Sequence, residues 1–361
     1  MNNNVYDSIV IGAGLAGLMT ARELMLSGQK VALYEAGSVG GECSWAGGGI
    51  LSPLYPWREL AILSELTVVS QRLYPEISHE LFEKTGIDPE WQQCGMLLLN
   101  VDDSDDVQSW VLKNQYPIEL LNEDQLHRNF NVRVRNSGTA LWLPKVAQVR
   151  NPRLIRALKS YLLQAGVDIF EKTRVNRLRT RGGKLQEIET ARGNVSVPVV
   201  VLSAGAWSCD LLPAINIRPV RGQMLCYQAP RDYLTHILLK DNIYAIPRRD
   251  GHILVGSTVE EVGYDKTITT EARMFLAEAA EKLLPEINQF PLVTQWSGLR
   301  PATTSGIPYI SAHPEIEGLY LNTGHFRNGI LFASGAARLL ADIILDRNPV
   351  VERNIFQFEA A

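Results

Sequence analysis

The chain has 361 residues, of which 46% are hydrophobic and 20% are charged, and its formal net charge is -4. This length can bury a substantial core and allows two or three domains, and the composition excludes a disordered chain. The negative charge argues against nucleic acid as a partner, because a surface that follows phosphates needs an excess of positive charge.

The sequence predicts a cytoplasmic protein. The N-terminus lacks the positively charged region of a signal peptide, and no apolar run reaches the length of a membrane span. Four cysteines are scattered without a CxxC pair or metal-ligand spacing: Cys43, Cys94, Cys209 and Cys226. This pattern predicts no metal site and fits reduced thiols.

The segment from residue 7 to residue 35 predicts a strand, a tight turn, a helix and a second strand. Residues 8–11 form a short apolar run, Gly28 is a plausible helix stop, and residues 30–34 supply the next strand before Glu35. The turn contains three glycines in GxGxxG spacing: Gly12, Gly14 and Gly17. This arrangement predicts a dinucleotide site, with the pyrophosphate at the helix N-terminus and Glu35 on a ribose hydroxyl.

The motif alone leaves two questions open. A bare GxGxxG also occurs in ordinary strand-to-helix turns, where the glycines serve only packing, although the flanking strands, helix and acid favour the nucleotide. The pyrophosphate and ribose contacts are shared by NAD, NADP and FAD, so the segment does not choose among them.

Residues 36–57 are rich in glycine and other small residues, and they predict a loop pressed against a ligand. Three successive glycines at 47–49 let backbone come close to something flat or crowded, and Cys43 and Ser44 could donate hydrogen bonds. The alternative is a flexible surface loop, but the apolar neighbours Trp45, Ile50 and Leu51 would pack poorly in one.

The middle of the chain predicts a helix over residues 59–85, then short strands at 95–100 and 139–143 around an acidic run that begins a solvated helix at 102–106. A helix capped by Asn151 follows, with proline at its first position. Short strands are expected at 168–170 and 175–178, and one buried strand over 195–202.

The last part predicts strands at 224–228, 244–248 and 252–258, and a helix over 271–284. Residues 318–346 then repeat the strand, glycine turn and helix of the opening segment. We therefore expect a discontinuous nucleotide domain formed by 1–85, 146–218 and 298–361, and a substrate domain formed by 86–145 and 219–297.

Six motifs in order resemble the D-amino-acid oxidase family of FAD-dependent amine oxidoreductases, and within it the glycine oxidases of thiamine biosynthesis. They are VIGAGLAG with Glu35, GGECSWAGGGILSP, VVLSAGAWS, YAIPRRDGHILVGST, WSGLRPATTSGIPYI and GHFRNGILFASG. The resemblance covers essentially the whole chain. It implies an α/β, overall α+β, fold in which a Rossmann-type FAD-binding domain carries an inserted antiparallel-sheet substrate domain.

The resemblance implies non-covalent FAD, although Cys43 lies in the predicted flavin loop. The residues that it places on the cofactor are Gly12, Gly14, Leu15, Gly17, Glu35, Ala36, Cys43, Ser44, Gly48, Gly49, Ile50, Val175, Arg327, Asn328, Gly329, Ile330 and Leu331. The turn at 327–331 would present helix N–H groups to the electron-rich pyrimidine edge of the flavin.

The resemblance also implies the substrate residues. Arg300 would grip the carboxylate of an amino acid with its planar fork, and Tyr244 would add a hydroxyl to the same carboxylate. Arg327 and Ile50 would line the pocket. Val259 stands where the best-known family pattern carries a longer apolar residue, so it would leave room for D-alanine or a small secondary amine beside glycine.

The implied reaction is oxidative deamination. A hydride would pass from the α-carbon to flavin N5, the imine would be hydrolysed to a 2-oxo acid, and O2 would be reduced to hydrogen peroxide. No side chain is obviously required as a base; His325 is the nearest candidate, and a structural role is expected for it. The alternatives are a quinone- or protein-linked dehydrogenase of the same fold, a nicotinamide-dependent reductase and a non-catalytic FAD-binding subunit; a homo-oligomer is possible.

Overall fold

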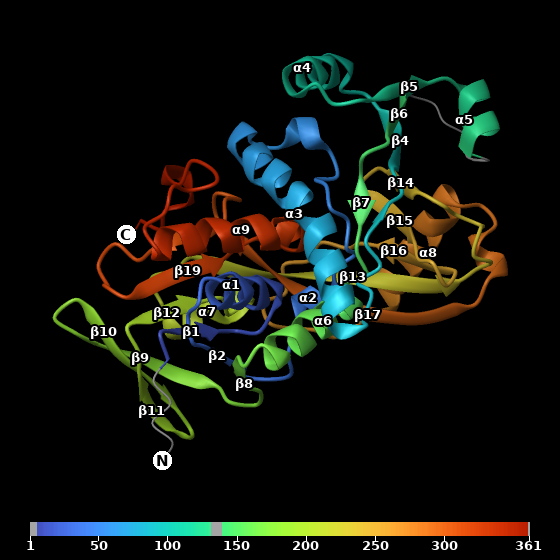
Figure 1. The fold of residues 1–361 in the computed structure, drawn as a ribbon. Helices are drawn as coiled ribbons and strands as arrows, with labels where there is room; N and C mark the ends of the chain where they lie inside the picture. The colour runs from blue at the N-terminus through green and yellow to red at the C-terminus, as the bar shows by residue number, and fades with distance from the viewer. Residues whose placement is uncertain (1–5, 131–138, 360–361) are drawn as a thin grey trace.

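The computed structural model describes residues 6–130 and 139–359. The N-terminal residues 1–5, which entered the prediction of a missing signal peptide, lie outside these ranges. Within them the chain forms a parallel-sheet part and an antiparallel-sheet part, which lie side by side (Figure 1).

A six-stranded sheet carries the opening segment. Its order is β18 (Tyr309–Ala312), β19 (Leu319–Thr323), β12 (Val199–Leu202), β1 (Ser8–Ile11), β2 (Val31–Tyr34) and β8 (Asp168–Phe170). All neighbours pair in parallel except β18, which runs antiparallel to β19. Strands β1 and β2 are buried throughout, as near-continuous apolar runs in a parallel sheet should be.

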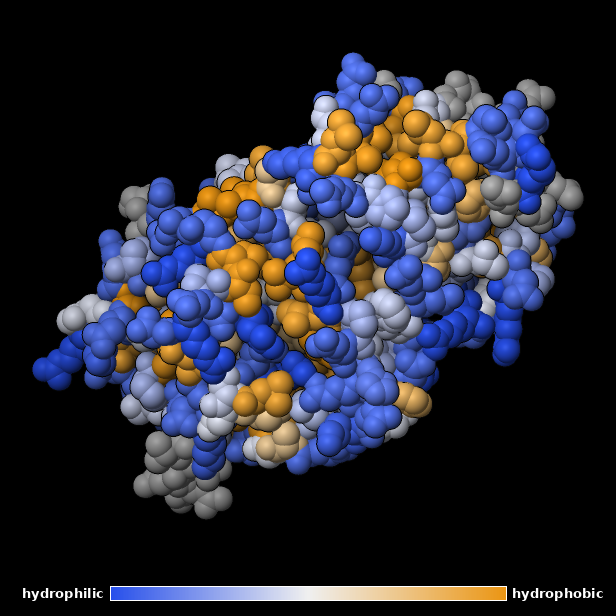
Figure 2. Space-filling view, turned by 45° about the horizontal axis from the view of Figure 1, so that its top comes forward, coloured by the Kyte–Doolittle hydropathy of each residue, from blue (hydrophilic) through white to orange (hydrophobic). Residues whose placement is uncertain are grey.

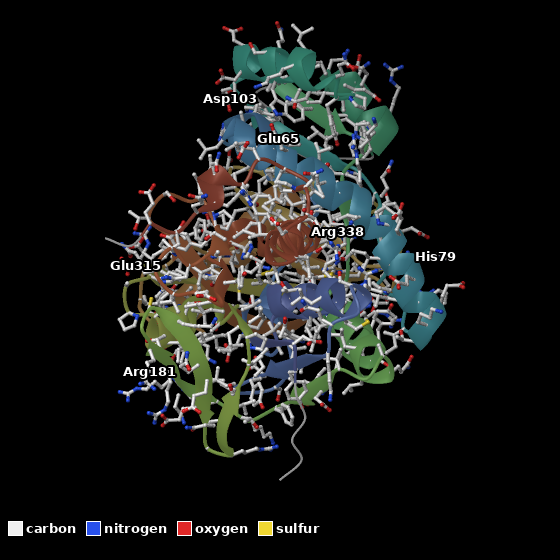
Figure 3. The ribbon with its side chains drawn as sticks, turned by 60° about the vertical axis from the view of Figure 1, so that its left-hand side comes forward. Glu65, His79, Asp103, Arg181, Glu315 and Arg338 are labelled. Atoms are coloured by element: carbon white, nitrogen blue, oxygen red, sulfur yellow. The ribbon has the colours of Figure 1, made fainter. Side chains whose placement is uncertain are left out.

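Four helices cover this sheet and share one hydrophobic core with it. They are α1 (Leu15–Leu26), α3 (Ala61–Thr85), α6 (Asn151–Gln164) and α9 (Gly329–Ile344). Figure 3 shows Arg338 on α9 between α1 and α3, and its guanidinium lies 2.5 Å from the carboxylate of Glu23 on α1. These contacts pack the last long helix of the chain against the first one.

An eight-stranded sheet forms the second part. Its order is β17 (Leu292–Thr303), β13 (Ile217–Gln228), β16 (His252–Gly256), β15 (Ile243–Pro247), β14 (Ile237–Lys240), β4 (Met96–Val101), β6 (Thr139–Leu143) and β5 (Glu119–Leu121). Every pair is antiparallel except β14 with β4, which are parallel. The expected antiparallel sheet is therefore present with one parallel pair.

Smaller elements complete the fold. Helix α8 (Thr270–Leu283) packs on the large sheet, while α4 (Ser104–Asn114) and α5 (Glu123–Phe130) stand at its far end in Figure 1. A three-stranded sheet of β9 (Val175–Arg181), β10 (Lys184–Thr190) and β11 (Gly193–Ser196) projects beside the parallel sheet. Two-residue strands β3 (Gln92–Gln93) and β7 (Ala147–Gln148) form a ribbon, and short helices occur at α2 (Cys43–Ala46) and α7 (Ser208–Leu211).

Two local predictions were wrong. The apolar run over 195–202 is two strands in two sheets, β11 and β12, separated at Pro198, which has no N–H for a strand ladder. Asn151 does not cap its helix, because it is the first helical residue and Arg150 holds the cap position without a side-chain bond. The Asn151 amide has a different use, described below.

On the face drawn in Figure 2, hydrophobic side chains lie in separate patches bordered by hydrophilic ones. Scattered exposed hydrophobic residues of this kind are ordinary for folded domains. Among the helices of residues 6–130 and 139–359, none combines the length and the hydrophobicity needed to cross a membrane.

Candidate active site

The turn between β1 and α1 can be built only from glycine at two positions. Gly12 has a φ of +99°, and a Cβ there would lie 2.4 Å from the carbonyl oxygen of Ser203. A Cβ on Gly17 would lie 1.9 Å from the carbonyl oxygen of Gly12, so α1 packs directly on the turn. Gly14, at the cap position of α1, has no side chain to cap the helix; Ser44 accepts only the first N–H, that of Leu15, which leaves the next N–H groups of the first turn for an anion.

Glu35 lies at the carboxyl end of β2 and reaches back to this turn. Its carboxylate accepts the N–H of Ala13 at 2.8 Å and the N–H of Gly37 at 2.7 Å. These bonds fix the acid beside the glycine turn, where the motif predicted a ribose contact.

The loop of residues 43–50 returns to the same turn from the other side. It begins with the short helix α2, and the Ser44 hydroxyl accepts the N–H of Leu15 at 2.8 Å. Gly49 has a φ of +80°, and a Cβ on Gly48 would lie 2.6 Å from Ile246 of β15. The loop is thus packed between α1 and the eight-stranded sheet, which favours the ligand-lining interpretation over a flexible surface loop.

The side chains of Asn151 and Arg248 donate hydrogen bonds to backbone carbonyl groups of this loop. The Asn151 amide donates to the carbonyl oxygens of Ser44 and Gly47 at 2.9 and 2.6 Å. Arg248 is buried and donates to the carbonyl oxygens of Gly48 and Val149 at 2.8 and 3.0 Å. Burial, and then the positive charge of a neighbouring arginine, lowers the pKa of Arg248 to about 10.

Sequence reasoning missed Arg248. The motif YAIPRR contains two adjacent arginines, and the second, Arg249, is exposed and pairs with Asp88 at 2.7 Å. No local pattern distinguishes the two, because the acceptors of Arg248 come from distant segments of the chain.

Arg300 lies on β17 with its guanidinium over Gly222 of β13, where a Cβ would come within 2.1 Å of Nη2. It donates to the Ser257 hydroxyl at 2.6 Å and to the Thr258 carbonyl oxygen at 3.1 Å. These hydrogen bonds hold the guanidinium in place. Because it has no carboxylate partner among the described residues, its charge is left for an anion.

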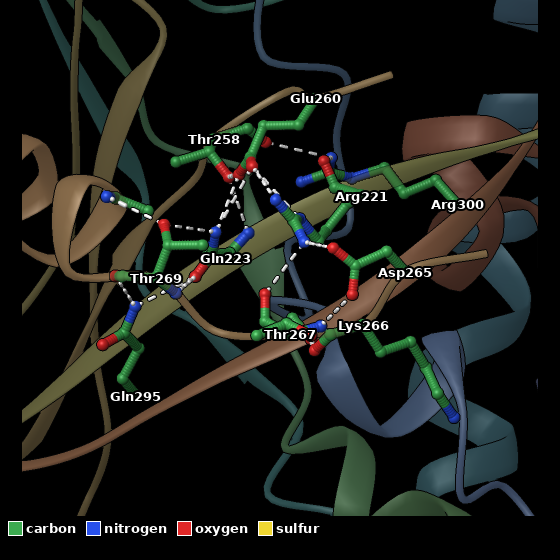
Figure 4. A network of polar contacts seen from close by, with 12 residues as sticks. Arg221, Gln223, Thr258, Glu260, Asp265, Lys266, Thr267, Thr269, Gln295 and Arg300 are labelled. Atoms are coloured by element: carbon green, nitrogen blue, oxygen red, sulfur yellow. Dashed lines mark hydrogen bonds and ion pairs between the residues drawn. The ribbon is translucent and has the colours of Figure 1, made fainter. Parts of the chain in front are cut away.

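A polar network supports the segment on which Arg300 is anchored (Figure 4). Arg221 is buried between two acids, with 2.5 Å to Glu260 and 2.7 Å to Asp265. The backbones of Arg221 and Glu260 exchange two hydrogen bonds of 2.8 and 2.9 Å, and Thr258 donates its hydroxyl to Glu260. These contacts fix the carbonyl oxygens that orient Arg300.

Arg327 and Tyr244 line the same cavity as Arg300. Partial burial, followed by the positive charge of Arg300, lowers the pKa of Arg327, while Tyr244 acts in the opposite direction. Two guanidinium groups that repel each other at one end of a cavity favour binding of an anion there. Val259 also lines the cavity and is 49% exposed, so its short side chain leaves open space.

Two further titratable groups line the cavity. His325 is buried, its Nε2 has no hydrogen-bond partner among the described residues, and burial lowers its pKa to about 4, so the imidazole is neutral at pH 7. Glu59 was missed from the sequence, because it stands at the start of an ordinary amphipathic pattern. Burial raises the pKa of Glu59 to about 7, against the hydrogen bonds from Thr67 and Asn328.

One cavity of about 890 Å³ joins the glycine turn to these groups. The predicted residues that line it are Gly12, Gly14, Leu15, Glu35, Ala36, Cys43, Ser44, Gly48, Gly49, Ile50, Val175, Tyr244, Val259, Arg300, Arg327, Asn328, Gly329 and Ile330. The other two predicted residues do not line the cavity. Gly17 packs against the turn, and the Leu331 side chain is in the hydrophobic core. A contact between the Leu331 backbone and the cofactor stays a prediction.

The cavity fits an extended dinucleotide cofactor. Its volume is at the upper end of the range for ligand pockets, about 300–1,000 Å³. The glycine turn lies directly on the backbone of Ser203, and the buried Ser203 hydroxyl on the cavity wall has no partner among the described residues. The residues present therefore fit FAD.

Comparisons with known proteins agree with this geometry. Residues 7–343 match the family model described as FAD dependent oxidoreductase, DAO. The chain is 42% identical over 349 residues to a glycine oxidase of Pseudomonas aeruginosa, covering 95% of this chain and 96% of that protein. It is 30% identical over 351 residues to the glycine oxidase of Geobacillus kaustophilus, covering 94% of this chain and 93% of the relative.

The fold is also that of solved relatives. The crystal structure of the Geobacillus kaustophilus glycine oxidase superposes with a TM-score of 0.93 at 28% identity and covers 99% of both chains. An L-proline dehydrogenase from P. horikoshii superposes with a TM-score of 0.88 at 19% identity, covering 98% of this chain and 96% of the other, and shows the fold alone. The resemblance inferred from the six motifs is confirmed: the chain belongs to the family of FAD-dependent oxidoreductases, and FAD is its cofactor.

Proposed function

We propose that this protein oxidises glycine, a small D-amino acid or a small secondary amine to the imine and passes the two electrons to O2, which becomes hydrogen peroxide. Water hydrolyses the imine to the 2-oxo acid, with release of ammonia from a primary amine substrate or of a primary amine from a secondary one. The observation that carries the proposal is the pair of arginines at one end of the cavity, neither of which has a carboxylate partner among the described residues. The names of the relatives, glycine oxidase, agree with it.

Different residues of the cavity would bind the cofactor and the substrate. The glycine turn, Glu35 and the loop of residues 43–50 would hold FAD, which supplies a two-electron acceptor when bound. Arg300 and Tyr244 would hold the substrate carboxylate, and this fixed contact would orient the α-carbon towards the flavin. The space beside Val259 would accept a methyl group on the α-carbon or on the amine.

We propose the domain division in the same terms. Residues 1–85, 146–218 and 298–361 would form the FAD domain, and residues 86–145 and 219–297 the substrate domain. Strands β13 and β17 run across two of these boundaries, so the chain would pass between the domains inside continuous strands. This arrangement would place Arg300 next to the cofactor while keeping it in the large sheet.

A substrate panel with peroxide detection tests the function. Glycine, sarcosine, N-ethylglycine and D-alanine should each consume O2 and release an equivalent amount of peroxide, with bulky D-amino acids slower. Reduction of the flavin without O2 consumption would instead indicate a dehydrogenase with another acceptor. A yellow protein whose flavin is not reduced by any of these amines under anaerobic conditions would contradict the proposal and favour a non-catalytic FAD-binding subunit.

A further inference from the structure

The carboxylate of Glu59 lies on the cavity wall. It is hydrogen-bonded to the residue that precedes helix α9, and the N-terminus of this helix lies at the cavity. Its Oε1 accepts the side-chain N–H of Asn328 at 2.7 Å, and its Oε2 accepts the Thr67 hydroxyl at 3.4 Å. Thr67 belongs to α3, and Asn328 immediately precedes α9. The carboxylate therefore connects the start of α3 to the start of α9.

The bond from Asn328 to Glu59 determines where the Asn328 side chain lies at the start of α9. Asn328 ends a 3-10 turn (Phe326–Asn328) and occupies the cap position of α9 with φ -98° and ψ 11°. An asparagine at this position can cap the helix by turning its carbonyl oxygen to the free N–H groups of the first helical turn, once its backbone relaxes towards the extended region. Here the Asn328 side chain makes no such bond, and its amide donates to Glu59 instead. Asn328, Gly329 and Ile330 all line the cavity, so the uncapped end of the helix faces the cofactor space.

Ion pairing does not explain why the Glu59 carboxylate is partly buried. Among the described residues no lysine or arginine forms an ion pair with it; Arg58, its neighbour in sequence, pairs with Asp103. Arg327, beside Asn328, forms no ion pair in the described part of the chain and packs its guanidinium over the Phe326 ring. A partly buried acid without a cation depends on its hydrogen bonds to offset the cost of leaving water, and the shorter of its two bonds goes to Asn328.

We propose that Glu59 is a positioning residue of the FAD site, which holds the Asn328 amide away from α9 and so leaves the N–H groups of the first helical turn free for the cofactor. Without Glu59, Asn328 would cap the helix and compete with FAD for these donors. The inference rests on the assignment of this cavity to FAD and does not depend on which amine is oxidised.

The test is titration of the apo-protein with FAD, followed by flavin fluorescence and absorbance. Glu59→Ala should raise the dissociation constant of FAD about three- to tenfold, because a free asparagine cap is worth that much to a helix. Glu59→Gln keeps an oxygen for the Asn328 amide and should bind FAD within about twofold of the original chain. Thr67→Val is the matched control, since it removes the other bond to Glu59 and should leave FAD binding unchanged.

Asn328 variants separate this explanation from general loss of structure. Asn328→Ala removes the competing cap, so adding Glu59→Ala to it should cause no further loss of FAD affinity. Asn328→Asp caps helices well and cannot donate to Glu59, so it should weaken FAD binding even if Glu59→Ala fails to fold. Unchanged FAD affinity in Glu59→Ala, or an equal loss in the Asn328→Ala background, would overturn the inference. A failed peroxide assay would bear on the amine substrate alone.

Discussion

At the scale of single residues, one end of the cavity carries positive charge that no acid neutralises among the described residues. Arg221 and Arg300 come from neighbouring strands, yet Arg221 is neutralised by Glu260 and Asp265, while Arg300 is bonded only to uncharged oxygens among the described residues. The network thus provides one structural arginine and one arginine whose charge is left for a ligand.

Arg300→Ala should therefore raise KM for glycine about 10- to 150-fold with a smaller change in kcat, because a charge-assisted pair of hydrogen bonds to the carboxylate is lost. Steady-state peroxide production checks this. Arg249→Ala is the matched control, since Arg249 is exposed and pairs with Asp88 outside the cavity. An unchanged KM in Arg300→Ala would contradict the assignment.

The residues that could be predicted are those whose role depends on a local pattern. Gly12 and Gly17 follow a fixed spacing, and the structure shows why no Cβ fits at either position. Asn151 was expected to be a helix cap, because local sequence shows the proline beside it but not the carbonyl groups of a loop more than a hundred residues away. Arg248 was missed for the same reason, and Glu59 because its place in an ordinary amphipathic pattern does not show the distant Asn328.

At the scale of elements, the loop of residues 43–50 depends on bonds from other elements. Asn151 of α6 holds its carbonyl groups from one side, and Trp296 of β17 donates to the Ala46 carbonyl oxygen at 2.9 Å from another. The loop is anchored at both parts of the fold. Its conformation should therefore be set before FAD binds.

Asn151→Ala should weaken FAD binding and lower the free energy of unfolding of the apo-protein by about 1–3 kcal/mol, because buried carbonyl groups lose their donor. Urea unfolding and FAD titration measure the two effects. Asn114→Ala is a suitable control, since the Asn114 amide also donates to a backbone carbonyl, that of Trp110, but at an exposed site. If both variants lost equal stability and FAD affinity, the loop would not depend on Asn151.

At the scale of the whole molecule, the parallel sheet was the more predictable part. Its strands are short apolar runs bounded by glycine, and the expected strands at 8–11 and 168–170 are confirmed. The large sheet was less predictable, because its strand β14 pairs in parallel with β4 although the two are separated by well over a hundred residues. The cavity lies where the two parts meet, so its lining comes from segments throughout the chain.

Burial lowers the pKa of some groups and raises the pKa of others. The free energy of unfolding of the whole molecule should therefore depend on pH. Burial lowers the pKa of His325 and of His236 to about 4, so these groups cost stability as the pH falls from 6.5 towards 4. Burial raises the pKa of Glu59 to about 7, so the folded protein holds this proton more tightly than the unfolded chain between pH 4.5 and 7. The Glu59 contribution is therefore largest at low pH and is lost as the pH rises.

Comparison of the original chain with Glu59→Gln isolates this last effect, because the histidines are common to both. The difference in the free energy of unfolding, original minus variant, should fall by about 2 kcal/mol between pH 5 and pH 8, since the amide cannot ionise where the carboxyl must. Urea unfolding of the apo-proteins across this range measures the difference. Glu278→Gln, at an exposed ion pair with Lys282, should show no such fall. A constant difference for Glu59→Gln would mean that the acid is already ionised at pH 5, and its burial would then have to be compensated by a cation.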